Sequence, residues 1–92
     1  MLEFEWDVRK AHANLTKHSV SFDEAITVFG DPLARTRVDH IHSIREERFW
    51  TIGRSSADRL LIVSHADRDE ITTIISARPV TSYEREQYEE AD

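Results

Sequence analysis

The fold of this chain is decided by its strongest strand-like run, Ile71-Thr72-Thr73-Ile74-Ile75-Ser76-Ala77-Arg78, which is followed by Pro79. Apolar side chains fall on both alternating faces of this run, and that pattern predicts a central strand of a sheet rather than an edge strand. Proline lacks an N–H and holds the residue before it in an extended conformation. We therefore expect Arg78 at the very end of this strand.

Arg78 in that position would project its guanidinium group from a well-defined place. The planar guanidinium forms bidentate hydrogen bonds with phosphate or carboxylate groups. The position therefore suits an anion-binding site, and it suits a structural ion pair equally well.

Two further strands are predicted before this one, at residues 48–54 and 60–66, and residues 33–41 form a weaker strand pattern. Short polar turns at 55–58 and 67–70 separate the strong strands. Turns of this length join antiparallel neighbours, because parallel strands need a long crossover connection.

Helical patterns flank the strands on both sides. Asp7 is a good N-cap for a helix that runs to about residue 18, a second helix ends near Gly30, and a final helix reaches about residue 90. The second and third helices each begin with a capping box, Ser21 with Glu24 and Thr81 with Glu84. Residues 1–92 thus predict a single α+β domain with two N-terminal helices, an antiparallel meander of three to four strands and a C-terminal helix.

The composition excludes several classes of protein. The 92 residues contain no cysteine, so a disulfide framework and a thiolate zinc site are both excluded. The longest aliphatic run, residues 60–63, is too short to cross a bilayer, and the acidic N-terminus lacks the basic region of a signal peptide. We expect a cytoplasmic protein without a membrane segment.

The net charge of −6 argues against nonspecific binding of a polyanion. The last nine residues carry five acids and one base, so much of the negative charge lies at the C-terminal end. Ten of the twelve basic residues are arginine, which suits a small local site for phosphate or carboxylate.

Several polar clusters remain open to two interpretations. Lys17 and His18 at the end of the first helix suit the helix dipole, and they also suit contact with an anionic substrate. His40 and His42 could ligate a metal, but no third ligand stands at a defined spacing, so a solvated loop is the better interpretation. Glu47 is either part of a solvated turn or an acid–base group.

An ordered set of motifs along nearly the whole chain resembles the BrnT family. The motifs are Phe4-Glu5-Trp6-Asp7, Lys10-Ala11, Asn14, Lys17-His18, residues 20–25, Glu47-Arg48-Phe49, residues 52–55, residues 75–78, Thr81, Glu84-Arg85 and Tyr88. Members of this family are ribonuclease toxins of type II toxin–antitoxin systems with a RelE-like fold. Each is neutralised by a BrnA antitoxin, a ribbon-helix-helix protein that also binds DNA.

The resemblance implies metal-independent RNA cleavage with no cofactor. A base would deprotonate the ribose 2′-hydroxyl, cations would stabilise the charge on the phosphate, and an acid would protonate the leaving 5′-oxygen. It implies roles for Arg78 and Arg54 at the phosphate, and for His18 or Glu47 in acid–base chemistry, with His65 a weaker candidate. Lys10 and Lys17 would contact RNA.

Two other functions stay open at this point. The chain departs from the family at Thr73, where a basic residue is common, and together with the acidic net charge this motivates a catalytically weak or inactive homologue. Such a protein would act as an antitoxin-binding or corepressor module, with DNA contacted only through the antitoxin. A small α+β domain with an unrelated ligand is the third interpretation.

Overall fold

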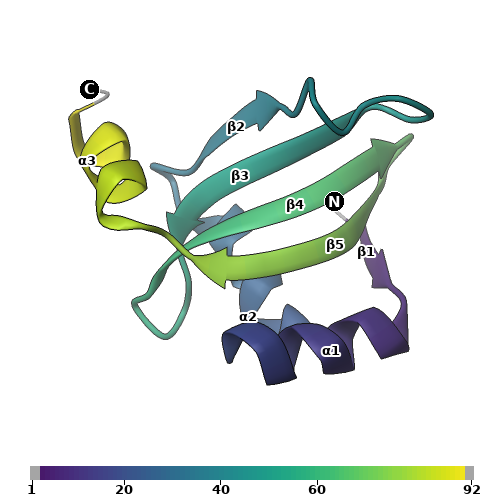
Figure 1. Ribbon diagram of the computed structural model, residues 1–92, viewed down its shortest axis with the longest axis horizontal. Helices are drawn as coiled ribbons and strands as arrows, with labels where there is room; N and C mark the ends of the chain where they lie inside the picture. Colours follow the sequence, from purple (N-terminus) through teal and green to yellow (C-terminus); the bar gives the residue numbers. More distant parts are fainter. Residues whose placement is uncertain (1–2, 91–92) are drawn as a thin grey trace.

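The computed structural model describes residues 3–90 and shows a five-stranded sheet with three helices (Figure 1). The strands are β1 (Glu3–Trp6), β2 (Arg35–Val38), β3 (Arg48–Arg54), β4 (Leu60–Arg68) and β5 (Ile71–Pro79). The helices are α1 (Val8–His18), α2 (Phe22–Ile26), which continues into a 3-10 turn at Thr27–Gly30, and α3 (Ser82–Glu90). The α+β class is therefore confirmed.

The sheet order is β1-β5-β4-β3-β2, with β1 parallel to β5 and the other pairs antiparallel. The predicted antiparallel meander of three to four strands is wrong in this respect, because a fifth strand at the N-terminus makes the sheet mixed. β1 has only four residues, and its partner lies almost seventy residues away. In the sequence this strand is marked only by alternation. Phe4 and Trp6 pack on the core, and Glu3 and Glu5 point the other way.

The boundaries of most other elements agree with the sequence. Asp7 and Ser21 cap α1 and α2 as predicted, with side-chain oxygens that accept from the N–H groups of Arg9 and Glu24. β3 has the predicted bounds. β4 runs two residues further than predicted, since the β4–β5 turn contains only Asp69, at φ 56°, and Glu70. Arg78 is the second-last residue of β5.

A β-bulge interrupts the β4–β5 ladder. Ser64 pairs with Ser76 and His65 pairs with Ile74, which leaves Ile75 without a partner on β4. The extra residue changes the alternation, so Ile74 and Ala77 both point into the core while Ser76 and Arg78 point to the other face. The regular alternation that the sequence suggests along 71–78 is therefore broken at one place.

The core lies between one face of the sheet and the helices α1 and α2, which Figure 1 shows together on the same side. Its fully buried members are Val20, Phe22, Ala25, Val28, Leu61, Val63, Ile74 and Ala77. Burial of such apolar side chains is the main stabilising term for a domain of this size. α3 lies apart from α1 and α2, so the opposite face of the sheet is free to form a cavity.

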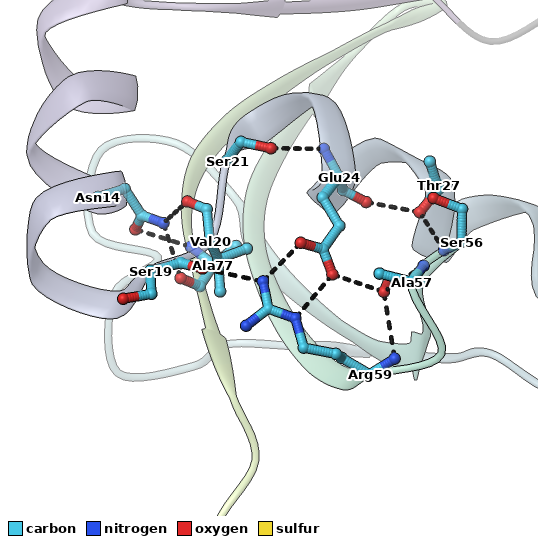
Figure 2. Close-up of polar contacts among 11 residues, drawn as sticks. Asn14, Ser19, Val20, Ser21, Glu24, Thr27, Ser56, Ala57, Arg59 and Ala77 are labelled. Atoms are coloured by element: carbon cyan, nitrogen blue, oxygen red, sulfur yellow. Dashed lines mark hydrogen bonds and ion pairs between the residues drawn. The ribbon is translucent and has the colours of Figure 1, made fainter.

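Asn14 joins α1 to β5 through two hydrogen bonds and to the segment before α2 through a third (Figure 2). Its Nδ2 donates to the carbonyl oxygens of Val20, at 2.9 Å, and Ala77, at 2.8 Å, and its Oδ1 accepts from the Ala77 N–H at 3.0 Å. Asn14 is 6% exposed. A buried polar side chain is favourable when its hydrogen bonds are complete, and here it completes those of Val20 and Ala77 as well.

A second polar cluster joins the β3–β4 turn to the helices (Figure 2). The Glu24 carboxylate accepts from the Arg59 guanidinium through both oxygens and from the Ser55 hydroxyl at 2.6 Å. Arg59 also donates to the carbonyl oxygen of Ser19, the αL residue that ends α1. The hydrogen bond from Arg59, opposed by burial and supported by Ser55, lowers the pKa of Glu24. Glu24 therefore acts as a structural anchor.

We predict that Asn14→Ala destabilises the protein by about 2–4 kcal/mol, because it leaves buried backbone groups of Val20 and Ala77 without partners. Urea denaturation followed by circular dichroism would measure the change. Thr73→Val is the matched control, since it removes a single exposed hydrogen bond, to Glu5 at 2.9 Å. It should cost less than about 0.5 kcal/mol. Equal losses in the two variants would contradict the anchoring role of Asn14.

Candidate functional site

A cavity of about 610 Å³ lies between α3 and the face of the sheet that α1 and α2 do not cover. Its volume is in the range of small-molecule and cofactor sites. Its charged side chains are Arg35, Arg37, Arg78, Asp39 and Glu84, and its ring side chains are Trp50, Tyr83, Tyr88 and His42. Three arginines against two carboxylates make this surface slightly cationic, in a chain whose net charge is −6.

The strand register sets the cavity floor in two rows across the sheet. The first row consists of Arg35, Ile52, Ile62 and Arg78. The second row consists of Arg37, Trp50, Ser64 and Ser76. Directly opposite residues of neighbouring strands share a face, so each row presents one side chain per strand. The floor therefore has arginines on its outer strands, β2 and β5, and apolar or small side chains between them.

Arg78 holds Glu84 of α3 in a bidentate ion pair. Its two terminal nitrogens lie 2.8 and 2.9 Å from the two oxygens of Glu84, and one also donates to the Pro79 carbonyl oxygen at 3.2 Å. Glu84 completes the predicted capping box by accepting from the Thr81 N–H at 2.8 Å. The hydrogen bond from Arg78 outweighs burial and lowers the pKa of Glu84 to about 2. The structural ion pair is thus real, and a phosphate would have to replace Glu84 at this guanidinium.

Arg37 differs from Arg78, because within residues 3–90 its guanidinium makes no hydrogen bond or ion pair. It is exposed and stands on the edge strand β2 beside Trp50. This cation is available to an anionic ligand without the loss of a partner.

Asp39 and His42 form a dyad at the rim of the cavity. The Nδ1 of His42 lies 2.8 Å from Asp39 Oδ2, and the Asp39 Oδ1 accepts from the backbone N–H of His42 at 3.3 Å. Burial opposes ionisation of Asp39, but its hydrogen bonds with His42 lower its pKa below the usual value. An ionised carboxylate that orients an imidazole is a common arrangement for acid–base chemistry. His42 lies in an exposed loop, as the sequence interpretation expected, and its contact with Asp39 is the feature that the sequence did not reveal.

Arg54 lies at the end of β3 on the same face as Arg78 but does not line the cavity. Its guanidinium is 3.7 Å from Asp58, and its N–H donates to Asp31 at 2.7 Å. Asp31 also accepts from the Tyr88 hydroxyl at 3.3 Å, which fixes the far end of α3. Gly53 permits this approach, because a Cβ there would lie 3.0 Å from both Val28 and Ala34.

Glu47 lies in a different hollow, of about 460 Å³, at the other end of the sheet. Five carboxylates, those of Glu5, Glu46, Glu47, Asp67 and Asp69, line it with the single arginine Arg68. This concentration of negative charge repels a phosphate. The structure therefore does not bring Glu47 together with Arg78.

Lys10, Lys17 and His18 belong to α1, which packs on the opposite face of the sheet from the cavity. Both lysines are exposed, and His18 is half-buried in the last turn of the helix. Of the residues predicted to act together, Arg78 alone lines the cavity.

His65 is 1% exposed and lies on the helix-covered face, so it does not approach Arg78. Its ring stacks on Phe49 and meets Phe29 edge-on. Its Nε2 lies 2.8 Å from the Thr51 hydroxyl and its Nδ1 lies 2.7 Å from Asp67. These contacts satisfy both ring nitrogens, which identifies His65 as a structural residue of the core.

The sequence prediction missed most of the cavity. Arg35 and Arg37 stand two apart in the weak strand candidate, and this spacing could have placed them on one face. Their proximity to Trp50 and Arg78 depends on the pairing of four strands, which no local pattern reveals.

Neither a metal site nor a membrane-spanning helix was found in residues 3–90. No group of three or more histidine or acidic side chains in this range is placed to hold a metal ion. No helix in the range is both long and apolar enough to span a bilayer.

Comparisons with known proteins agree on one family. The family model described as "Ribonuclease toxin, BrnT, of type II toxin-antitoxin system" matches residues 6–84. The crystal structure of the Brucella abortus ribonuclease toxin BrnT superposes with a TM-score of 0.64 at 18% identity, over 89% of this chain and 100% of that one. At this identity the second match supports the fold alone. A search of curated proteins found no match.

We predict that the Arg78–Glu84 pair stabilises the protein in a pH-dependent way. Because the pKa of Glu84 falls from 4.5 to about 2 on folding, its contribution is complete above pH 4.5 and is lost as the pH falls to about 2. The stability difference between wild type and Glu84→Gln should therefore shrink over that interval in urea titrations. Glu86→Gln is the matched control for loss of one charge, because Glu86 is a neighbour without a partner in residues 3–90. A constant difference for Glu84→Gln would contradict the pair's contribution.

Proposed function

Because this chain belongs to the BrnT family, the ribonuclease toxins of type II toxin–antitoxin systems, we propose that it is an endoribonuclease that cleaves RNA without a metal ion. The observation that carries the proposal is the cavity in which three arginines meet the Asp39–His42 dyad. Cations and an oriented imidazole are the groups that such a cleavage needs.

The proposed reaction is attack of the ribose 2′-oxygen on the adjacent phosphorus. His42 accepts the 2′-hydroxyl proton, the new oxygen–phosphorus bond forms, and the bond to the 5′-oxygen breaks. The leaving 5′-oxygen takes a proton from solvent water, the protonated His42 returns its proton to the solvent, and the product carries a 2′,3′-cyclic phosphate. Arginine donors stabilise the extra charge on the phosphate oxygens, and this electrostatic term is commonly the largest in such reactions.

We propose Arg78 and Arg37 as the phosphate ligands, with Arg35 on the same floor. This retains the sequence-based role of Arg78 and moves the acid–base role from His18 or Glu47 to His42. Arg54 supports the site indirectly, because its N–H and the Tyr88 hydroxyl share the Asp31 carboxylate. Lys10, Lys17 and His18 would serve as contacts to a longer RNA or to a protein.

The proposed partner is an antitoxin, which every type II toxin requires for neutralisation. We propose that this antitoxin is a BrnA-type ribbon-helix-helix protein. We also propose that the fold is related to that of RelE and that the protein is cytoplasmic. DNA would be contacted only through the antitoxin. A ribbon-helix-helix gene beside this one would support the assignment.

A second candidate function is an inactive antitoxin-binding module. It is favoured by the observation that Glu84 already occupies Arg78, and by the five carboxylates around Thr73 and Glu47. Such a protein would form a tight complex with its antitoxin and alter operator binding, yet expression without the antitoxin would leave growth unchanged.

We predict that Arg78→Ala and Glu84→Gln have opposite effects on cleavage. Expression of wild type without antitoxin should arrest growth, and Arg78→Ala should relieve the arrest and lower cleavage in vitro by about 10²–10³-fold, as expected for loss of a transition-state donor. Glu84→Gln frees the same guanidinium and should retain or increase cleavage.

The matched control is Arg68→Ala, whose side chain is 82% exposed and lies in the acidic hollow. It should cleave like wild type. Equal loss in Arg78→Ala and Glu84→Gln would show that the pair is purely structural, and a harmless wild type that leaves RNA intact would overturn the enzymatic proposal.

We predict that His42→Gln lowers the rate of cleavage by about 10²–10⁴-fold, the usual contribution of a general base. It should also remove the acidic limb of the pH–rate profile, which loss of a structural contact would not do. His18→Gln and Glu47→Gln should keep both the rate and the profile. If His18→Gln removes the acidic limb instead, His18 of α1 is the general base and the assignment to His42 is wrong.

A further inference from the structure

The cavity floor contains a hollow that neither phosphate binding nor the acid–base dyad uses. In the second row of the floor, Trp50 of β3 is followed by Ser64 of β4 and Ser76 of β5. Two of the smallest side chains thus stand beside one of the largest, and neighbouring strands are about 4.8 Å apart. The cavity that Trp50 lines therefore extends over two small side chains beside the indole.

The two serine hydroxyls of this hollow, those of Ser64 and Ser76, have no hydrogen-bond partner in the part of the chain that the structure describes. Both serines and Trp50 are half-buried. Each hydroxyl can act as a donor or an acceptor, so the pair matches the polar edge of a planar heterocycle.

We propose that Trp50, Ser64 and Ser76 form a nucleobase subsite, in which one base of the RNA stacks on the indole and its edge meets the serine hydroxyls. This inference rests on the proposed function and specifies how that site holds its substrate. Aromatic side chains bind single-stranded RNA by stacking, and hydrogen bonds to the base edge add selectivity. Arg37, directly opposite Trp50 on β2, would hold the phosphate next to the stacked base.

The other tryptophan makes a direct binding test available. Trp6 lies on the opposite, helix-covered face, where its ring meets Phe22 edge-on at 5.9 Å. A Trp6→Phe background leaves Trp50 as the single indole, so a base that stacks there should quench the fluorescence. The probes are four 2′-O-methyl tetranucleotides, one each of A, C, G and U. They lack the attacking hydroxyl and cannot be cleaved.

We expect saturable quenching in the Trp6→Phe protein. Ser76→Leu in this background should abolish it, because the larger side chain fills the hollow from β5 while Trp50 is unchanged. In the wild-type background Trp50→Leu should weaken tetranucleotide binding about five- to one-hundred-fold, the range for loss of one stacked base, and Trp50→Phe should weaken it less. Arg68→Ala in the Trp6→Phe background should quench normally. Thermal melting would confirm that each variant folds.

The outcomes separate the subsite from the proposed function. If RNA is cleaved but Trp50 is not quenched and Trp50→Leu binds normally, the subsite is wrong and the function stands. If the tetranucleotides quench Trp50 and RNA is never cleaved, the subsite stands and the enzymatic function is wrong. Quenching that persists unchanged in folded Ser76→Leu would also overturn the subsite.

Discussion

The bulge at Ile75 is the constraint on which both faces of this protein depend. It lets Ile74 and Ala77, separated by three positions, point into the same core, where the backbone N–H and carbonyl groups of Ala77 are both hydrogen-bonded to Asn14. On the other side it lets Ser76 and Arg78 reach the cavity floor. In a regular strand with Ser76 and Arg78 outward, Ile74 would be outward too, and a large apolar side chain would leave the core. A bulge beside a candidate site is a common way to direct side chains that regular pairing cannot.

The two faces of the sheet separate stability from recognition. The helix-covered face holds the apolar core and satisfies its polar groups internally, as in the contacts of His65 with Thr51 and Asp67. The open face keeps groups whose partners are incomplete or replaceable, namely Arg37, the serine hydroxyls and the Arg78 guanidinium. Charge is divided along the sheet rather than between its faces, since three arginines line the cavity and carboxylates dominate the hollow at the opposite end. A chain of net charge −6 can thus present a local surface for an anion.

Local chemistry explains which parts of the structure could be predicted from the sequence. Capping residues act within one turn, so Asp7, Ser21 and Thr81 marked the helix starts correctly, and the strand bounds around 48–54 followed from short apolar runs. The β1 strand and the bulge were missed, because both depend on pairing with distant residues. The roles of His18 and Glu47 stay predictions: both carry suitable groups, but the fold places His18 on the face opposite the cavity and Glu47 in an acidic hollow. His42 became a candidate through its contact with Asp39 at the rim of a cavity that only the tertiary structure forms.

The attachment of α3 reconciles the structural ion pair of Arg78 with its proposed role at a phosphate. The helix is held at these two places: Glu84 binds Arg78 near its start, and Tyr88 binds Asp31 just over one turn later. A phosphate that takes the place of Glu84 would remove the first contact and leave the second, so the helix need not leave the protein for RNA to enter. In such an exchange the guanidinium keeps the same number of hydrogen bonds, because it donates two to the carboxylate before and two to the phosphate afterwards. An ion pair that anchors α3 is therefore compatible with the proposed phosphate contact of Arg78, and the same carboxylate orients the guanidinium at the cavity.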